Sequence, residues 1–108
     1  MPSFRFTVYG PEQGFFLSFL HDFKTLAYIV GHSGTVQLPR PGAQVEEILS
    51  VIFAEGNGEG SGPGFTIEGR SMSVGDVVHV AGFGAWLCDS VGWKGIPPAD
   101  ARRFPLVE

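Results

Sequence analysis

The stretch from Gly69 to Gly95 reads GRSMSVGDVVHVAGFGAWLCDSVGWKG, and it decides the fold of the chain. Within it, the pair Gly75-Asp76 precedes a β-branched run, and the turn Gly82-Phe83-Gly84 precedes a second apolar run. Two β-prone runs separated by a few residues that include glycine are typical of a β-hairpin. The sequence therefore predicts a hairpin over about residues 76–91.

The predicted hairpin sorts its side chains onto two faces. Side chains alternate across a strand, and a three-residue glycine turn would pair His79 with Leu87. Cys88 then lies on the core face with Trp86, so it is a small buried residue and not a thiolate activated by an imidazole. Asp89 shares the other, open face with His79. These two residues form a candidate imidazole–carboxylate pair for acid–base chemistry, although such a pair on an exposed sheet face is commonly only structural.

The composition indicates one globular domain. The 108 residues are enough for one core and too few for two, so a single domain is predicted over residues 1–108. Hydrophobic residues make up 44% of the chain and charged residues 17%, which excludes a disordered protein. The net charge of -4 argues against duplex nucleic acid as a partner, because duplex-binding domains concentrate Lys and Arg to neutralise phosphates.

Cysteine usage and hydropathy indicate the compartment. Cys88 is the single cysteine, so no internal disulfide can form, and no Cys or His stands at the spacing of a zinc site. No apolar run approaches the roughly 18 residues of a membrane span. These features predict a cytoplasmic protein with no membrane segment, no metal and no cofactor.

The N-terminal part of the chain supplies further strands. Alternation of apolar and polar residues predicts a strand over residues 3–9. Between residues 10 and 40 the fold stays undefined, since the apolar run at 15–20 fits a buried strand and a buried helix equally well. In the same region, Gly31 and Gly34 predict a turn between two short strands.

One principal helix is predicted over about residues 43–55. Its apolar residues fall at the i, i+3, i+4, i+7, i+8 spacing of a stripe that faces a core, and Gly56 ends it. Glu46 lies near the positive end of the helix dipole, where negative charge is favoured. The apolar stripe consists of Val45, Ile48, Leu49, Ile52 and Phe53.

Two segments are predicted to lack regular structure. The glycine-rich residues 56–64 predict a flexible loop, because they lack both the preceding strand and the lysine of a phosphate-binding loop. Residues 97–108 predict an irregular tail anchored by Phe104 and Leu106. The whole pattern predicts an α+β fold with a mainly antiparallel sheet, one principal helix and a C-terminal β-hairpin.

Polar residues before the hairpin are candidate site residues. Ser71 and Ser73 could act as nucleophiles, although serine before a strand commonly closes a local turn by bonding to backbone. Asp76 can accept nearby backbone N–H bonds and so fix the start of the strand. Gly75 would supply a backbone angle that strains other residues. Trp93 could stack on a base or a sugar, or pack at the rim of the core.

Two motifs carry a resemblance to a known family. The run from Gly69 to Val78 reads GRSMSVGDVV, and residues 88–94 read CDSVGWK. Together with the Val-Glu-Glu-Ile pattern in the predicted helix, Val45 to Phe53, they resemble the YodL-like domain, which is found in proteins of bacterial plasmids, integrated elements and phages. The similarity spans residues 45–96, and the long glycine loop and Cys88 depart from the family pattern.

The resemblance implies a biological setting and no particular reaction. The family brings no established activity or cofactor, so the resemblance implies an accessory protein of a mobile element that binds a host or defence component. We therefore predict a small non-enzymatic protein-binding accessory protein of a phage or mobile element, with counter-defence as the specific function. A homodimer is left open. The candidate binding residues are Arg70, Ser71, Ser73, Asp76, His79, Asp89 and Trp93.

The alternative function is a small-ligand-binding or hydrolytic domain that uses the region of Ser71, Ser73 and Asp76. The shape of the surface separates the two interpretations. A deep concave site lined by these residues would favour the alternative, whereas a flat apolar patch would favour a protein partner.

Overall fold

A computed structural model of the chain describes residues 3–11, 27–38, 44–59, 64–67, 71–89 and 92–107. Its strands form one antiparallel sheet of order β2-β1-β3-β4-β5, which confirms the predicted α+β class. The elements are β1 (Ser3–Pro11), β2 (Tyr28–Gln37), α2 (Val45–Glu55), β3 (Val77–Val80), β4 (Gly84–Asp89), β5 (Gly92–Gly95) and α3 (Pro98–Ala101).

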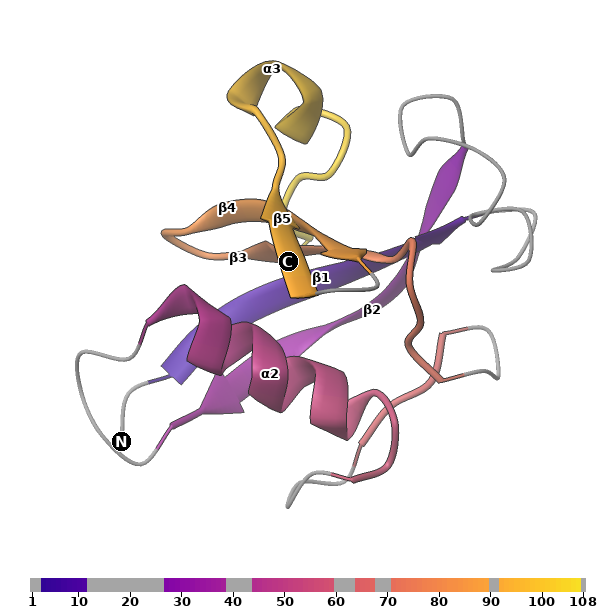
Figure 1. Cartoon of the computed structure of the whole chain (residues 1–108), viewed down its shortest axis with the longest axis vertical. Coiled ribbons are helices and arrows are strands. Elements are labelled where there is room, and N and C mark those ends of the chain that lie inside the picture. Colours follow the sequence, from indigo (N-terminus) through magenta and orange to yellow (C-terminus); the bar gives the residue numbers. More distant parts are fainter. Residues whose placement is uncertain are drawn as a thin grey trace.

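Helix α2 covers one face of the sheet and crosses in front of β1 and β2 (Figure 1). Its buried residues Ile48, Leu49 and Ile52 are each 0% exposed. They pack in one cluster with Phe6 of β1 and with residues of β2 and β3. The predicted helix and its apolar stripe are therefore confirmed, and the stripe forms the centre of the main core.

The opposite face of the sheet is covered by the C-terminal segment, residues 96–107. Phe104 is 0% exposed and its ring lies edge-on to the rings of Tyr9 and Tyr28, at centroid distances of 5.3 and 5.1 Å. The same cluster includes Val77 of β3. The expectation of an open face on the hairpin is therefore wrong, because the C-terminal segment folds back over it.

The C-terminal segment is also more regular than predicted. Its residues Pro98–Ala101 form the single turn of α3, with proline at the start, where a missing N–H costs nothing. Phe104 anchors the segment as expected, and Val107 ties its end to the sheet by donating its N–H to Thr7 Oγ1 over 2.9 Å. The prediction of an irregular tail is wrong for α3, because packing against the sheet orders a stretch with little periodicity.

The sequence also misassigned the region of Gly31 and Gly34. Both glycines lie inside β2, a single ten-residue strand that pairs with β1, and no turn divides it. A Cβ at Gly31 would stand 2.6 Å from Cγ2 of Ile67. Gly31 therefore lets the Ile67 side chain pack against the backbone of β2, and it does not form a turn. The ambiguous run at residues 15–20 lies outside the described residues.

The hairpin forms as predicted, but in a different register. Val80 pairs with Gly84 and His79 with Ala85, so the loop is residues 81–83 and each partner is displaced by two positions from the expected one. A shift of two residues leaves every side chain on its predicted face, because side chains alternate with a period of two. Gly84, with φ of 82°, makes the left-handed turn that follows the loop.

The end of α2 is set by packing. Gly56 follows the helix with right-handed φ of -69°, and a Cβ there would stand 2.5 Å from Cγ of Met72. The returning chain also bonds to the helix end, since the N–H of Phe65 donates to Glu55 O and that of Met72 donates to Gly56 O. Gly56 ends the helix as predicted, but it does so by allowing this close return. Residues 60–63 of the predicted flexible loop lie outside the described part.

Candidate functional site

Asp76 is the most buried of the predicted site residues and has a structural role. Its side chain is 0% exposed, and its Oδ2 accepts the Ser73 N–H over 2.8 Å. Gly75 adopts φ of 99°, a left-handed angle that favours glycine, and donates its N–H to Cys88 O. The predicted turn at Gly75-Asp76 is therefore confirmed, and it leaves the carboxylate of Asp76 inaccessible to a substrate.

Replacing Asp76 with Ala should lower the free energy of unfolding by about 1–2 kcal/mol, because the Ser73 N–H would lose its buried acceptor. Asp76→Asn should recover part of the loss, since an amide oxygen still accepts that bond. Chemical denaturation of the three proteins measures the effect. An Asp76→Asn protein that denatures like the parent but has lost partner binding would instead make Asp76 a binding residue.

His79 and Asp89 do not form the predicted pair. They share a face, but the register places Asp89 four residues beyond His79 along the hairpin, about 13 Å at the rise of a strand. The Nδ1 atom of His79 lies 2.6 Å from the carbonyl oxygen of Phe104 and donates to it, because a carbonyl oxygen can only accept. His79 therefore fixes the C-terminal segment to β3.

Cys88 is buried on the face predicted for it, two residues from Trp86 on β4 and paired with Trp93 of β5. Burial, followed by the charges of Asp76 and Asp89, raises the pKa of its thiol to about 12. Such a thiol is not a nucleophile near neutral pH, because the thiolate is the reactive form.

We expect a thiol reagent to label Cys88 slowly in the native protein at pH 8 and quickly after denaturation. Because the pKa is raised in the folded state, the thiol's contribution to stability is full below about pH 8.5 and is lost as the pH rises towards 12. The labelling rate followed by mass spectrometry tests this. Native labelling as fast as that of the denatured chain would contradict the burial of the thiol.

The remaining predicted residues do not converge on one site. Ser71 is exposed, Ser73 is held in the turn by Asp76, and Trp93 lies on β5 on the side of α2. Arg70 lies outside the described residues. No deep site lined by Ser71, Ser73 and Asp76 together is formed by the described chain, which removes the feature that would have favoured a hydrolytic domain.

Five partly exposed aromatic side chains instead lie on the side of the sheet that carries α2. We call this group the aromatic band. Phe83 at the hairpin tip is 38% exposed and lies edge-on to Phe4 at 6.0 Å, and its carbonyl accepts the Trp86 indole N–H over 3.0 Å. At the other end, Phe53 of α2 lies edge-on to Trp93 at 6.2 Å. The aromatic band consists of Phe4, Phe53, Phe83, Trp86 and Trp93.

The centre of the band is created by strand register. Trp86 stands opposite Gly95, and Trp93, two residues away on β5, occupies the diagonal position on the same face. A Cβ at Gly95 would lie 3.5 Å from the Trp86 ring, so glycine leaves the indole lying flat over bare backbone. Trp86 and Trp93 therefore lie on the same face of the sheet, where both are half-buried against the main core and no side chain at position 95 covers the Trp86 ring.

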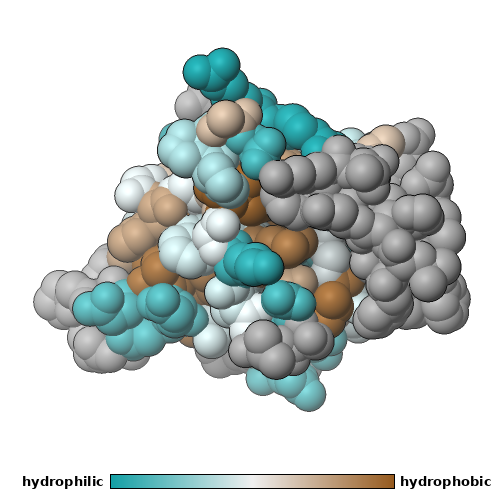
Figure 2. Space-filling model, turned by 45° about the horizontal axis from the view of Figure 1, so that its top comes forward, coloured by the Kyte–Doolittle hydropathy of each residue, from teal (hydrophilic) through white to brown (hydrophobic). Residues whose placement is uncertain are grey.

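The surroundings of the band are partly apolar and acidic. Figure 2 shows apolar residues in the middle of one face of the molecule, bordered by hydrophilic residues. Helix α2, which contributes Phe53, carries Glu46, Glu47 and Glu55 and no basic residue. A partner that covers the band next to α2 would thus meet negative charge at its rim.

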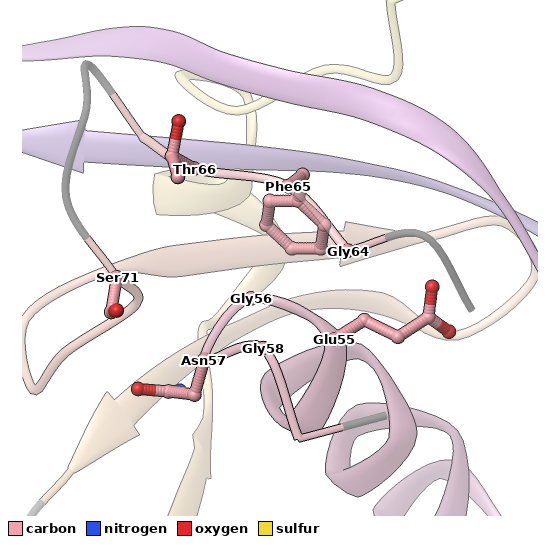
Figure 3. Close-up of a pocket in the computed structure, with 8 residues that line it drawn as sticks. All are labelled: Glu55, Gly56, Asn57, Gly58, Gly64, Phe65, Thr66 and Ser71. Atoms are coloured by element: carbon pink, nitrogen blue, oxygen red, sulfur yellow. The ribbon is translucent and has the colours of Figure 1, made fainter. Parts of the chain in front are cut away.

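A shallow pocket of about 400 Å³ lies at the C-terminal end of α2, and we call it the α2-end pocket (Figure 3). The Phe65 ring lies over Gly56, with Glu55 on one side and Asn57 and Ser71 on the other. The pocket is lined by Glu55, Gly56, Asn57, Gly58, Gly64, Phe65, Thr66 and Ser71.

An aromatic stack forms one wall of the α2-end pocket. The His32 ring of β2 lies parallel to the Phe65 ring, with centroids 4.3 Å apart and planes 3° apart. Burial lowers the pKa of His32, and the nearby Glu55 carboxylate opposes that shift more weakly. Burial therefore favours the uncharged form of the imidazole that stacks on Phe65.

Sequence reasoning found Trp93 but missed most of these surface features. The alternation of the hairpin placed Trp86 on the core face, yet nothing in the sequence joined it to Phe4 and Phe83. The α2-end pocket likewise combines a helix end, β2 and two returning segments that are far apart in the chain. Predicting the pocket would have required a signal that Phe65 and Met72 return to the end of α2.

Among the described residues, no three His, Cys, Asp or Glu side chains gather closely enough to hold a metal ion. The helices in the described part of the chain are too short or too polar to cross a membrane. In comparisons with known proteins, no family model, curated protein or solved structure matches this chain.

Proposed function

We propose that this chain is a non-enzymatic protein-binding module whose aromatic band contacts a partner protein. The band is the observation that carries the proposal. Trp and other aromatic side chains are enriched at the energetic centres of protein interfaces, because they bury large apolar area with few rotatable bonds. Five of them on one side of the sheet, with Phe4 and Trp86 contacting Phe83 and with Phe53 contacting Trp93, form the kind of anchor that a protein partner needs.

The partner that fits this surface presents apolar side chains with basic residues around them. The two indoles and Phe83 offer rings against which apolar side chains can pack. The helix that contributes Phe53 to the band carries carboxylates and no basic residue, and exposed charges at an interface rim mainly steer association and select the partner. A strongly acidic protein is disfavoured by the same charges and by the net charge of -4.

Site-specific photo-crosslinking in cells tests the band directly. With p-benzoylphenylalanine in place of Phe83, we expect a discrete crosslinked species, and with the same group in place of Thr35, an exposed residue of β2, we expect none. The species should disappear when Trp93→Ala is added, while Ser71→Ala should leave it unchanged. Equal crosslinking from both positions, or a species that survives Trp93→Ala, would refute a specific interface at the band.

Within this function, the biological role we propose is that of an accessory protein of a phage or mobile element, with counter-defence as its specific form. The resemblance of residues 45–96 to the YodL-like domain supports this role. Genes for phage structure or plasmid transfer beside this one would agree with it, and a metabolic operon would speak against it.

The counter-defence role has a functional test. Expression of the chain in bacteria that carry a defence system should raise the plating efficiency of a restricted phage. Trp93→Ala should remove the effect and Ser71→Ala should keep it. Loss with Ser71→Ala but not with Trp93→Ala would favour the small-ligand or hydrolytic alternative.

A further inference from the structure

We propose that the α2-end pocket binds the guanidinium group of an arginine side chain. That the arginine belongs to a protein partner rests on the proposed function, whereas the site itself rests on the geometry of the pocket. Three features carry the inference, namely the Glu55 carboxylate, a flat aromatic wall and a floor of glycine backbone.

Charge favours a cation in this pocket. Glu55 lines it, and within the described part of the chain its carboxylate forms neither a hydrogen bond nor an ion pair. The pocket also lies at the C-terminal end of α2, where the helix dipole adds partial negative charge. His32 is half-buried against Phe65, and burial lowers the pKa of its imidazole, which disfavours its positive charge. An incoming cation would therefore meet negative potential from two sources.

Shape favours a planar cation. The Phe65 ring, held parallel to His32, presents an aromatic wall beside Glu55 (Figure 3). A guanidinium is planar, stacks on aromatic rings and donates two parallel hydrogen bonds to a carboxylate, whereas an ammonium is a compact and strongly hydrated point charge. This pairing of ring and carboxylate selects arginine over lysine.

The opposite side of the pocket is bordered by a fixed side chain and open backbone. Asn57 donates through Nδ2 to the carbonyl oxygen of Phe53 over 2.8 Å. Its side chain points away from Glu55 (Figure 3). Gly58 has no heavy atom within 4 Å of the position of a Cβ, so backbone without a side chain lies between Asn57 and Glu55.

Two-dimensional ¹H–¹⁵N NMR with Nα-acetyl-arginine amide as the probe tests this site. We expect progressive and saturable shifts of the amide signals of Gly56, Gly58, Gly64 and Phe65. Nα-acetyl-citrulline amide has the same shape without the charge, and it should bind up to about five-fold more weakly, the factor expected for one partly exposed ion pair. Equal responses to the two probes, or no shift at the pocket signals, would overturn the proposal.

Matched variants test whether the Glu55 carboxylate is the group that favours the charged arginine probe over citrulline. Glu55→Gln should reduce the arginine response to the level of citrulline, whereas Glu46→Gln, at the other end of the same helix, should leave it unchanged. Trp93→Ala should also leave it unchanged, because the probe does not need the aromatic band. An arginine response that is insensitive to Glu55→Gln would overturn the site, whereas loss of crosslinking at Phe83 with a normal arginine response would overturn only the proposed function.

Discussion

Ile52→Asp should unfold the protein. The side chain of Ile52 is 0% exposed at the centre of the cluster between α2 and the sheet. A carboxylate there would be buried without a partner, at a cost of several kcal/mol. A domain of this size is stable by only about 5–15 kcal/mol, so the loss removes most of its stability or all of it. Far-UV circular dichroism at 25 °C should show loss of the native spectrum.

The matched control for this change is Glu46→Ala. Glu46 lies on the exposed side of the same helix, so its loss should change the free energy of unfolding by no more than about 0.5 kcal/mol. Thermal melts of the two variants make the comparison. If both variants melted like the parent, the apolar stripe of α2 would not lie in the core.

Phe104→Ala should lower the free energy of unfolding by about 3–5 kcal/mol, the usual cost of truncating a fully buried aromatic residue. Its ring is enclosed by Tyr9 and Tyr28, and no other large residue of the C-terminal segment is as deeply buried among those described. At about 4–8 °C for each kcal/mol, the melting temperature should fall by about 12 °C or more.

Val107→Ala is the control for the C-terminal segment. Val107 is 39% exposed and is held mainly through its backbone, which donates to Thr7 and accepts from Ser33. Its truncation should cost less than about 1 kcal/mol, because those hydrogen bonds remain. Differential scanning calorimetry separates the two effects. Equal losses from the two variants would mean that the segment is held by its backbone and not by the Phe104 ring.

Local signals in the sequence were sufficient for the helix and for the turn before the hairpin. The stripe of α2 repeats at the helical period, and its burial needs only some apolar surface opposite it. The turn at Gly75 and Asp76 is formed by neighbours in the chain, since the Asp76 carboxylate bonds to the N–H of Ser73. Such contacts span few residues, so residue type alone predicts them.

The candidate site was less predictable, because its parts meet only in the folded chain. The faces of the hairpin were predicted correctly, because a register shift of two residues leaves each side chain on the same face. The pairing along the strands was not predicted, and it places Asp89 far from His79. The sequence offered Ser71, Ser73 and Asp76 as a cluster. In the structure, the turn buries Asp76 and holds Ser73, and only Ser71 lines the pocket.

The sequence by itself determined the secondary structure with strong periodicity, namely the first strand, the principal helix and the hairpin, because neighbouring residues set the pattern of burial. Only the tertiary structure decided that β2 runs unbroken through Gly31 and Gly34, since Ile67 packs closely against Gly31 from 36 positions further along the chain. It likewise decided that Phe104 covers the second face of the sheet, and that Phe4, Phe83 and Trp86 adjoin. Each of these contacts joins distant segments, and their geometry depends on how the whole sheet twists and pairs.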